Sequence, residues 1–172
     1  MATRLLAAFL CVAVGVCATN PLAGMPDVLF VLSDDLGFGE VGFTQGSSRV
    51  NTNLTTPNVD ALAASGVVFT DAYVGAPVCA PSRCALMTGR HSGHGTIRGN
   101  RDVDGHDYPL SANDTTFFAS FAAAGYHVSC VGKWGVGWVN NSGSPILHGC
   151  TDYFGEFVRI IVRRVGCIKF IK

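Results

Sequence analysis

An α/β fold with a mostly parallel sheet flanked by helices is the architecture that this sequence predicts. Short apolar segments rich in β-branched residues alternate along the chain with segments of helical pattern, which is typical of this class. The apolar segments are continuous, as in strands that are buried on both faces. With 172 residues, the chain is long enough for one domain with its own core.

The N-terminal segment has the pattern of a secretory signal peptide. Arg4 precedes an apolar run over residues 5–17, and small residues lead up to Ala18, where we expect cleavage. The expected signal peptide is therefore residues 1–18. The run is too short for a comfortable transmembrane helix. A buried N-terminal helix is the alternative.

Glycosylation triplets and cysteines fit an oxidising, secretory route. Three Asn-x-Ser/Thr triplets are candidate N-glycosylation sites: Asn53, Asn113 and Asn140. Five cysteines follow residue 18: Cys79, Cys84, Cys130, Cys150 and Cys167. An odd number leaves at least one sulfur without an intramolecular disulfide partner. Cys79 is our candidate for that role, and Cys130 with Cys150 is a candidate bridge whose pairing the sequence leaves open.

The first strand is expected over residues 27–33, and two acidic residues follow it. The carboxyl ends of strands in a parallel α/β sheet open onto the ligand crevice, so Asp34 and Asp35 are placed to bind a cation. The alternative is that both residues cap a turn before Gly37.

The next elements are a helix and a second strand. Thr56 is the expected N-cap, Pro57 the first helical residue and Gly66 the C-cap. Residues 67–70 have the composition of a strand.

A cysteine turn comes next and carries the strongest functional signal. Cys79, Pro81 and Arg83 lie in one short turn, and residues 82–88 are an expected helix whose positive dipole end faces Cys79. A buried or disulfide-bonded cysteine at a helix start is the alternative.

The last expected elements are a helix and a strand. Asn113 and Asp114 are expected to cap a helix over residues 115–124, and residues 126–131 form a third strand. Lys133 follows that strand, on the same side of the sheet as the acidic pair.

Charge divides the chain near residue 157. Residues 19–157 contain six Lys and Arg against all twelve acidic residues, whereas residues 158–172 contain five basic residues and no acidic one. The formal net charge of zero indicates neither a nucleic acid nor an acidic partner. The basic tail lacks a clean apolar helical stripe, so we expect no membrane association.

Four segments together resemble the type I sulfatases, the arylsulfatase-like members of the alkaline phosphatase superfamily. The segments are residues 26–37, 56–66, 79–90 and 124–135, in matching order and spacing. The resemblance covers roughly residues 26–157, and residues 158–172 match nothing in the family. It implies the N-terminal part of an alkaline-phosphatase-like catalytic domain, in truncated form.

The resemblance also implies a reaction. Cys79 would be oxidised to formylglycine by an endoplasmic-reticulum enzyme that reads Cys79, Pro81 and Arg83 before folding. The aldehyde hydrate would then attack the sulfur of a sulfate ester. Arg83 would hold the hydrate, and Lys133 would contact the sulfate and stabilise the transition state.

A divalent cation, usually calcium in this family, would be held by Asp34, Asp35 and the modified Cys79. The family often places a histidine near the site, which makes His91 and His94 candidate substrate contacts; solvated loop histidines are the alternative.

The resemblance therefore predicts a sulfuric ester hydrolase that is secreted, lysosomal or at the cell surface. A non-catalytic secreted fragment is one alternative. A phosphodiesterase or phosphonate hydrolase of the same superfamily is another.

Overall fold

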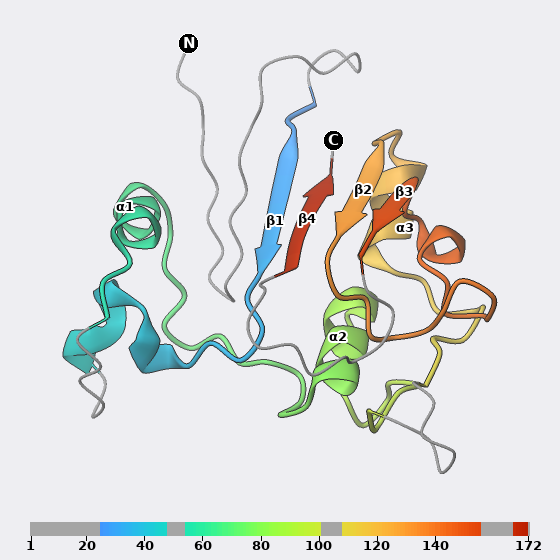
Figure 1. The fold of residues 1–172 in the computed structure, drawn as a ribbon, viewed down its shortest axis with the longest axis horizontal. Coiled ribbons are helices and arrows are strands. Elements are labelled where there is room, and N and C mark those ends of the chain that lie inside the picture. Colours follow the sequence, from blue (N-terminus) through green and yellow to red (C-terminus); the bar gives the residue numbers. More distant parts are fainter. Residues whose placement is uncertain (1–24, 48–53, 101–107, 156–166, 172) are drawn as a thin grey trace.

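The computed structural model describes residues 25–47, 54–100, 108–155 and 167–171 (Figure 1). Its strands are β1 (Val28–Leu32), β2 (Val128–Val131), β3 (Asp152–Phe154) and β4 (Cys167–Ile171). The α-helices are α1 (Pro57–Ser65), α2 (Cys79–Thr88) and α3 (Phe117–Ala123), and the 3₁₀-helices are η1 (Phe38–Glu40), η2 (Gly42–Ser47) and η3 (Ile146–His148). This is the α/β class that the sequence predicts.

The four strands form one sheet in the order β1-β4-β2-β3. β2 and β3 are parallel, whereas β4 pairs antiparallel with both β1 and β2. β1, β2 and β3 therefore run in the same direction, and all three end toward α2 (Figure 1). The described sheet is mixed because the segment that fills its centre comes from the expected basic tail.

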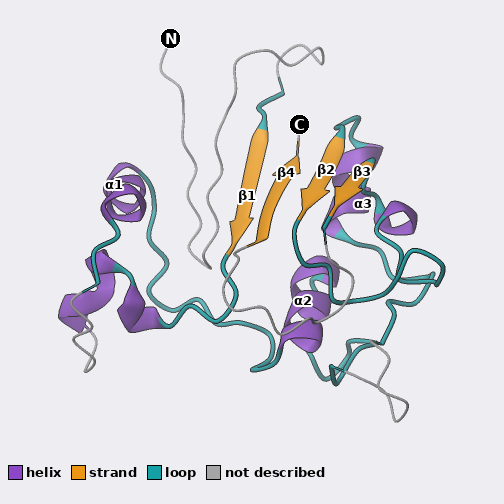
Figure 2. Cartoon of the chain, in the orientation of Figure 1, coloured by secondary structure: helices purple, strands orange, loops and turns teal. Residues whose placement is uncertain are grey.

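The core lies between α2, α3 and β2. Its largest fully buried members include Trp134, Phe118 and Met87. The rings of Phe118 and Trp134 are 5.9 Å apart, and Phe117 reaches Phe30 of β1 at 5.4 Å. Aromatic packing thus holds α3 against one face of the sheet. Figure 2 shows α3 behind β2 and β3.

α1 lies apart from the sheet, next to the 3₁₀-helices η1 and η2 (Figure 2). Thr56 Oγ1 accepts a hydrogen bond from the Gly42 N–H at 2.8 Å and donates one to Asp60 Oδ1 at 2.8 Å. Asp60 Oδ1 also accepts from the Phe43 N–H at 3.0 Å. The side chain at the expected N-cap therefore joins α1 to η2 instead of capping its own helix.

Three expected elements differ from the structure. Residues 67–70 form no strand, and their side chains are mostly exposed. α2 begins at Cys79, three residues before the expected start, because the Pro81 ring is tolerated within a first turn. α3 is capped by Thr116, whose Oγ1 accepts from the Ala119 N–H at 3.2 Å.

Several expected features lie outside the described residues: the signal peptide over residues 1–18, Asn53 and most of the tail over residues 158–172. Asn113 and Asn140 are both exposed, which is compatible with glycosylation. Cys79, Cys84, Cys130 and Cys150 are thiols, so the candidate Cys130–Cys150 bridge is not formed in this structure. Among the described residues, no helix has the length and apolar character needed to cross a bilayer.

Candidate active site

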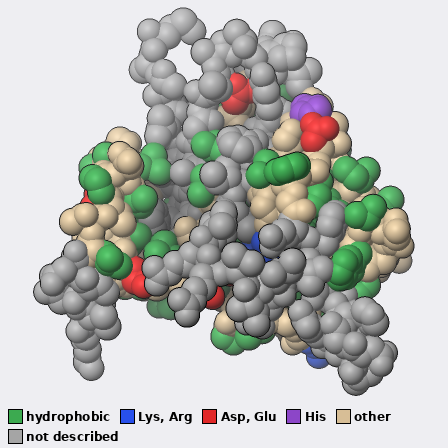
Figure 3. All heavy atoms as spheres, viewed as in Figure 1, with side chains coloured by type: hydrophobic (Ala, Val, Ile, Leu, Met, Phe, Trp, Pro, Cys, Tyr) green, Lys and Arg blue, Asp and Glu red, His purple; other side chains and the backbone are tan. Residues whose placement is uncertain are grey.

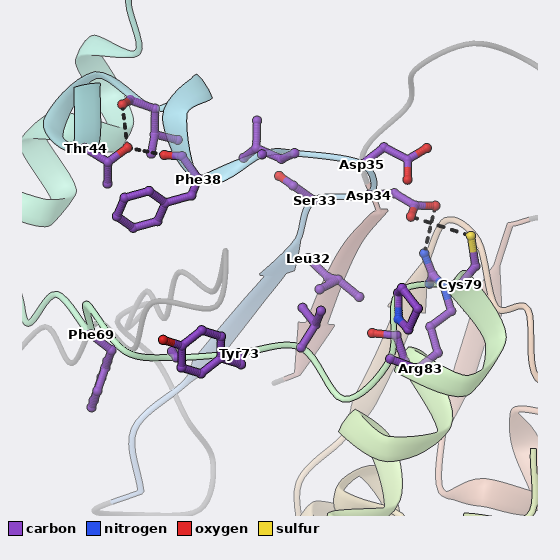
Figure 4. Close-up of a pocket in the computed structure, with 18 of the residues that line it drawn as sticks. Leu32, Ser33, Asp34, Asp35, Phe38, Thr44, Phe69, Tyr73, Cys79 and Arg83 are labelled. Carbon is purple, nitrogen blue, oxygen red and sulfur yellow. Dashed lines mark hydrogen bonds and ion pairs between the residues drawn. The ribbon is translucent and has the colours of Figure 1, made fainter. Parts of the chain in front are cut away.

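Side chains from three elements meet where β1 and β2 end. Asp34 follows β1, Cys79 and Arg83 lie in the first part of α2, and Lys133 follows β2. Figure 4 shows Asp34 directed at both Cys79 and Arg83. Because β1 and β2 run in the same direction, their following loops lie at one edge of the sheet, above the N-terminus of α2.

Asp34 is the centre of this cluster. Its Oδ2 accepts hydrogen bonds from Lys133 Nζ at 2.9 Å and from Arg83 Nη2 at 3.2 Å. Its Oδ1 lies 4.0 Å from Cys79 Sγ. One carboxylate therefore fixes two cations beside the cysteine.

The pKa values of the ion pair follow from these contacts. Burial alone would raise the pKa of the Asp34 carboxyl, but the hydrogen bond from Lys133 and the charge of Arg83 hold this pKa below its ordinary value. Burial would lower the pKa of the Lys133 ammonium, whereas hydrogen bonds to Asp34 and Cys79 raise it above its ordinary value. Both groups are therefore charged across the neutral range.

Arg83 is almost fully buried and is held at a fixed position. Only 3% of its side chain is exposed, and its Nη1 donates to the Lys133 carbonyl oxygen at 2.7 Å. Gly135 has a left-handed backbone, with φ of 72°, and a Cβ there would lie 3.3 Å from Arg83 Cδ. The small residue at position 135 therefore lets the loop after β2 pack directly on the arginine.

The first turn of α2 has a contact that the sequence did not predict. The Ala80 N–H donates to Asn100 Oδ1 at 3.0 Å. Asn100 lies in a long polar loop, and no local pattern in the sequence links it to a helix that begins 21 positions earlier.

A cavity of about 540 Å³ opens beside this cluster. Asp34, Asp35, Cys79, Ser82 and Arg83 line one end of it, and most of the other lining side chains are apolar. Figure 4 places Phe38, Phe69 and Tyr73 at a distance from the cysteine, around the remaining wall. The charged cluster is thus accessible from a cavity with apolar walls.

The described residues do not by themselves form a metal site. Asp34 Oδ2 already accepts from two cations. Asp35 is exposed and has a left-handed backbone, with φ of 57°. Within the described part of the chain, no three His, Cys, Asp or Glu side chains are grouped so as to hold an ion. The two carboxylates and the sulfur would need several further oxygen ligands to bind calcium.

The two candidate loop histidines are not part of the cluster. His91 and His94 are exposed and follow the C-terminal end of α2, whose ten residues span about 15 Å from Cys79. Their rings are 6.4 Å apart, and neither lines the cavity. The structure therefore brings together Asp34, Cys79, Arg83 and Lys133, with Asp35 beside them, and leaves both histidines outside.

Comparisons with a family model, with curated proteins and with solved structures each find relatives of this chain. The Sulfatase family model matches residues 26–161. The chain is 34% identical over 162 residues to arylsulfatase D of Homo sapiens, covering 86% of this chain and 26% of that protein. It is 37% identical over 149 residues to arylsulfatase A of Bos taurus, covering 85% and 27% respectively.

Among solved structures, the crystal structure of Ps i-CgsB is similar, with a TM-score of 0.61 and 36% identity. The similarity covers 71% of this chain and 26% of that one. The chain thus spans about a quarter of the length of the relatives that it matches.

Proposed function

Because this chain belongs to the sulfatase family, we propose that it carries the nucleophile end of a sulfuric ester hydrolase site, with Cys79 as precursor of the nucleophile. The observation that supports this most is the convergence of Cys79, Arg83 and Lys133 on one carboxylate, Asp34. Two fixed cations beside a convertible cysteine suit a sulfate ester, which carries one negative charge and develops more on the leaving oxygen as the S–O bond breaks.

In the proposed reaction, the formylglycine-generating enzyme first oxidises Cβ of Cys79 by two electrons, with dioxygen as the oxidant and an external thiol supplying the other two electrons. The C–S bond breaks, the sulfur leaves as hydrogen sulfide, and the resulting aldehyde adds water to form a hydrate. One hydrate hydroxyl loses its proton and its oxygen attacks the sulfur, while the bond from sulfur to the ester oxygen breaks. The ester oxygen takes up a proton and leaves as the alcohol. The second hydroxyl then loses its proton, re-forms the aldehyde C=O and expels the sulfate. Arg83 holds the hydrate, and Lys133 contacts the sulfate oxygens.

A divalent cation, calcium by the family resemblance, is part of this proposal only with ligands beyond the described residues. Asp34 and Asp35 would contribute carboxylate oxygens, and water or other side chains would supply the rest. Calorimetric titration should give weak calcium binding that Asp35→Asn weakens further.

Synthesis in the secretory pathway also belongs to the proposal, because the formylglycine-generating enzyme acts there. The signal-like segment over residues 1–18 and the exposed Asn113 and Asn140 support this route. Immunofluorescence microscopy and assay of the culture medium would distinguish a secreted protein from a lysosomal or cell-surface one.

The test is turnover of an aryl sulfate by the full chain, co-expressed with a formylglycine-generating enzyme, with mass spectrometry of the Cys79 peptide. Cys79→Ala should abolish turnover. Cys150→Ala is the matched control, because this buried thiol lies before β3, does not line the cavity and should leave turnover largely intact.

Two outcomes would overturn the proposal. A chain that bears formylglycine but turns over no sulfate ester would be the non-catalytic fragment. Faster turnover of an aryl phosphodiester than of the aryl sulfate would assign the chain to the phosphodiesterase alternative.

A further inference from the structure

We propose that Asn100 is a positioning residue for the Cys79 site, which holds the first turn of α2 in the geometry that the reaction needs. This inference rests on the proposed function. Its basis is the hydrogen bond from the Ala80 N–H to Asn100 Oδ1, at 3.0 Å, across twenty positions of the sequence.

The first turn of α2 needs an acceptor from elsewhere in the chain. The first N–H groups of a helix have no partner within it, and a polar N-cap side chain usually accepts from one of them. Here the N-cap is Val78, which has no polar side-chain atom. Ala80 is only 3% exposed, so water is a poor substitute. Asn100 therefore does what the N-cap residue cannot.

The loop that carries Asn100 is fixed along α2. We call residues 91–100 the return loop. Thr96 Oγ1 lies 3.7 Å from Cys84 Sγ, and a Cβ on Gly95 would be 3.4 Å from the same sulfur. Ile97 is 1% exposed. From this buried contact at Cys84, four further residues bring the return loop to Ala80, one helical turn nearer the N-terminus.

The position of this turn decides the geometry of the site. Cys79 and Arg83 are four residues apart, so both face the same side of α2 and reach the same carboxylate, at 4.0 and 3.2 Å. If the first turn frays, Cys79 moves while Arg83, one turn later, stays. A displacement of about 1 Å at a reacting group can cost on the order of 100-fold in rate.

The first measurement is hydrogen exchange of the Ala80 amide, which needs no activity. Asn100→Ala should raise its exchange rate about 3- to 10-fold. Asn100→Asp should leave this rate near the original value, because a carboxylate oxygen also accepts from a helix N–H. Asn58→Ala, at an exposed position of α1, is the control. An unchanged Ala80 rate in Asn100→Ala would overturn the proposal.

The second measurement is aryl sulfate turnover by the formylglycine-bearing variants. Asn100→Ala should lower kcat about tenfold or more while KM changes less than about twofold, since the lost geometry concerns the nucleophile. Asn100→Asp should restore most of kcat but raise KM, because it adds a negative charge near the anionic substrate. A general folding defect would not give this split.

An Asn100→Ala protein with the original kcat, or an Asn100→Asp protein without recovery, would contradict the positioning role. If the unsubstituted protein turns over no sulfate ester, the proposed function fails. The exchange rate of Ala80 still decides whether Asn100 holds the turn.

Discussion

Gly135 shows how one residue without a side chain shapes the candidate site. Its φ of 72° is in the left-handed region, and its Cα faces the Arg83 side chain. Gly89, the C-cap of α2, has a similar φ of 67° but nothing within 4 Å of a would-be Cβ. The two glycines therefore share a backbone requirement, and they differ in that a Cβ at Gly135 would contact the Arg83 and Lys133 side chains.

We expect Gly135→Ala to lower the free energy of unfolding more than Gly89→Ala does. Both variants should lose roughly 1–2 kcal/mol from left-handed backbone strain. Gly135→Ala should lose about 1 kcal/mol more, because its methyl group displaces the buried Arg83. Urea denaturation measures both values. Equal losses would mean that the contact with Arg83 has no energetic consequence.

The Asp152 carboxylate offers a pH test at the same scale. Its pKa is held below the ordinary value by hydrogen bonds from His127 and Ser129. A lowered pKa means that the unfolded chain takes up a proton at a higher pH than the folded chain does. The stabilisation is therefore present above the ordinary pKa of 3.8 and is lost as the pH falls through the folded value.

When the pH is lowered from about 5 to about 2, the Asp152→Asn protein should accordingly lose less unfolding free energy than the unsubstituted protein does. Urea unfolding midpoints at several pH values measure this difference. Because the pair is exposed, about 1 M salt should shrink it. A difference that is absent at low salt would contradict the interpretation.

At the scale of elements, Thr116 connects α3 to η3. Its Oγ1 accepts from the Ala119 N–H at 3.2 Å and donates to the His148 carbonyl oxygen at 2.6 Å. Thr116→Ala should cost about 2 kcal/mol, because both hydrogen bonds of this buried side chain are lost at once. Thr115→Ala, at the exposed neighbouring position, should change stability by less than about 0.5 kcal/mol. If chemical denaturation gives the same loss for Thr116→Ala and Thr115→Ala, the hydrogen bonds of Thr116 do not stabilise the start of α3.

The sequence predicted the elements whose signals are local. The apolar run of β1, the Pro57 start of α1 and the end of α2 at Thr88 all depend on neighbouring residues. Residues 67–70 show the opposite case, because strand composition describes a side-chain preference and a strand also needs a pairing partner. Thr116 was missed because Asn113 and Asp114 are stronger N-cap types by composition.

The residues of the candidate site also separate into those that local sequence patterns predict and those that they do not. Asp34 and Lys133 were placed together because both follow strands of one direction, and the structure brings them to 2.9 Å. Asn100 could not be predicted, because its contact with Ala80 depends on how the return loop packs on Cys84. Long-range loop contacts have no periodicity that a sequence reveals.

For the whole molecule, the described surface carries many large apolar side chains. Tyr73 is 82% exposed, Phe154 80% and Leu147 68%. Figure 3 shows hydrophobic side chains on the exposed face over α1 and again on the β3 side. Exposed apolar groups and a formal net charge of zero both favour association with other polypeptide surfaces.

The sheet itself depends on β4, because β1 and β2 do not pair with each other. Lys169 of β4 lies opposite Phe30 of β1 on one side and Cys130 of β2 on the other. Proline in a central strand removes a ladder hydrogen bond and does not fit the pairing. Lys169→Pro should therefore separate the Asp34 end of the site from the Lys133 end.

We expect Lys169→Pro to lower the free energy of unfolding by at least about 2 kcal/mol. Lys169→Thr is the matched control, since threonine removes the charge but keeps the N–H and suits a strand. Urea denaturation separates the two variants. If both lose the same stability, β4 does not join β1 to β2. If only the proline variant is affected, the alignment of the two strand ends that carry Asp34 and Lys133 requires this central strand.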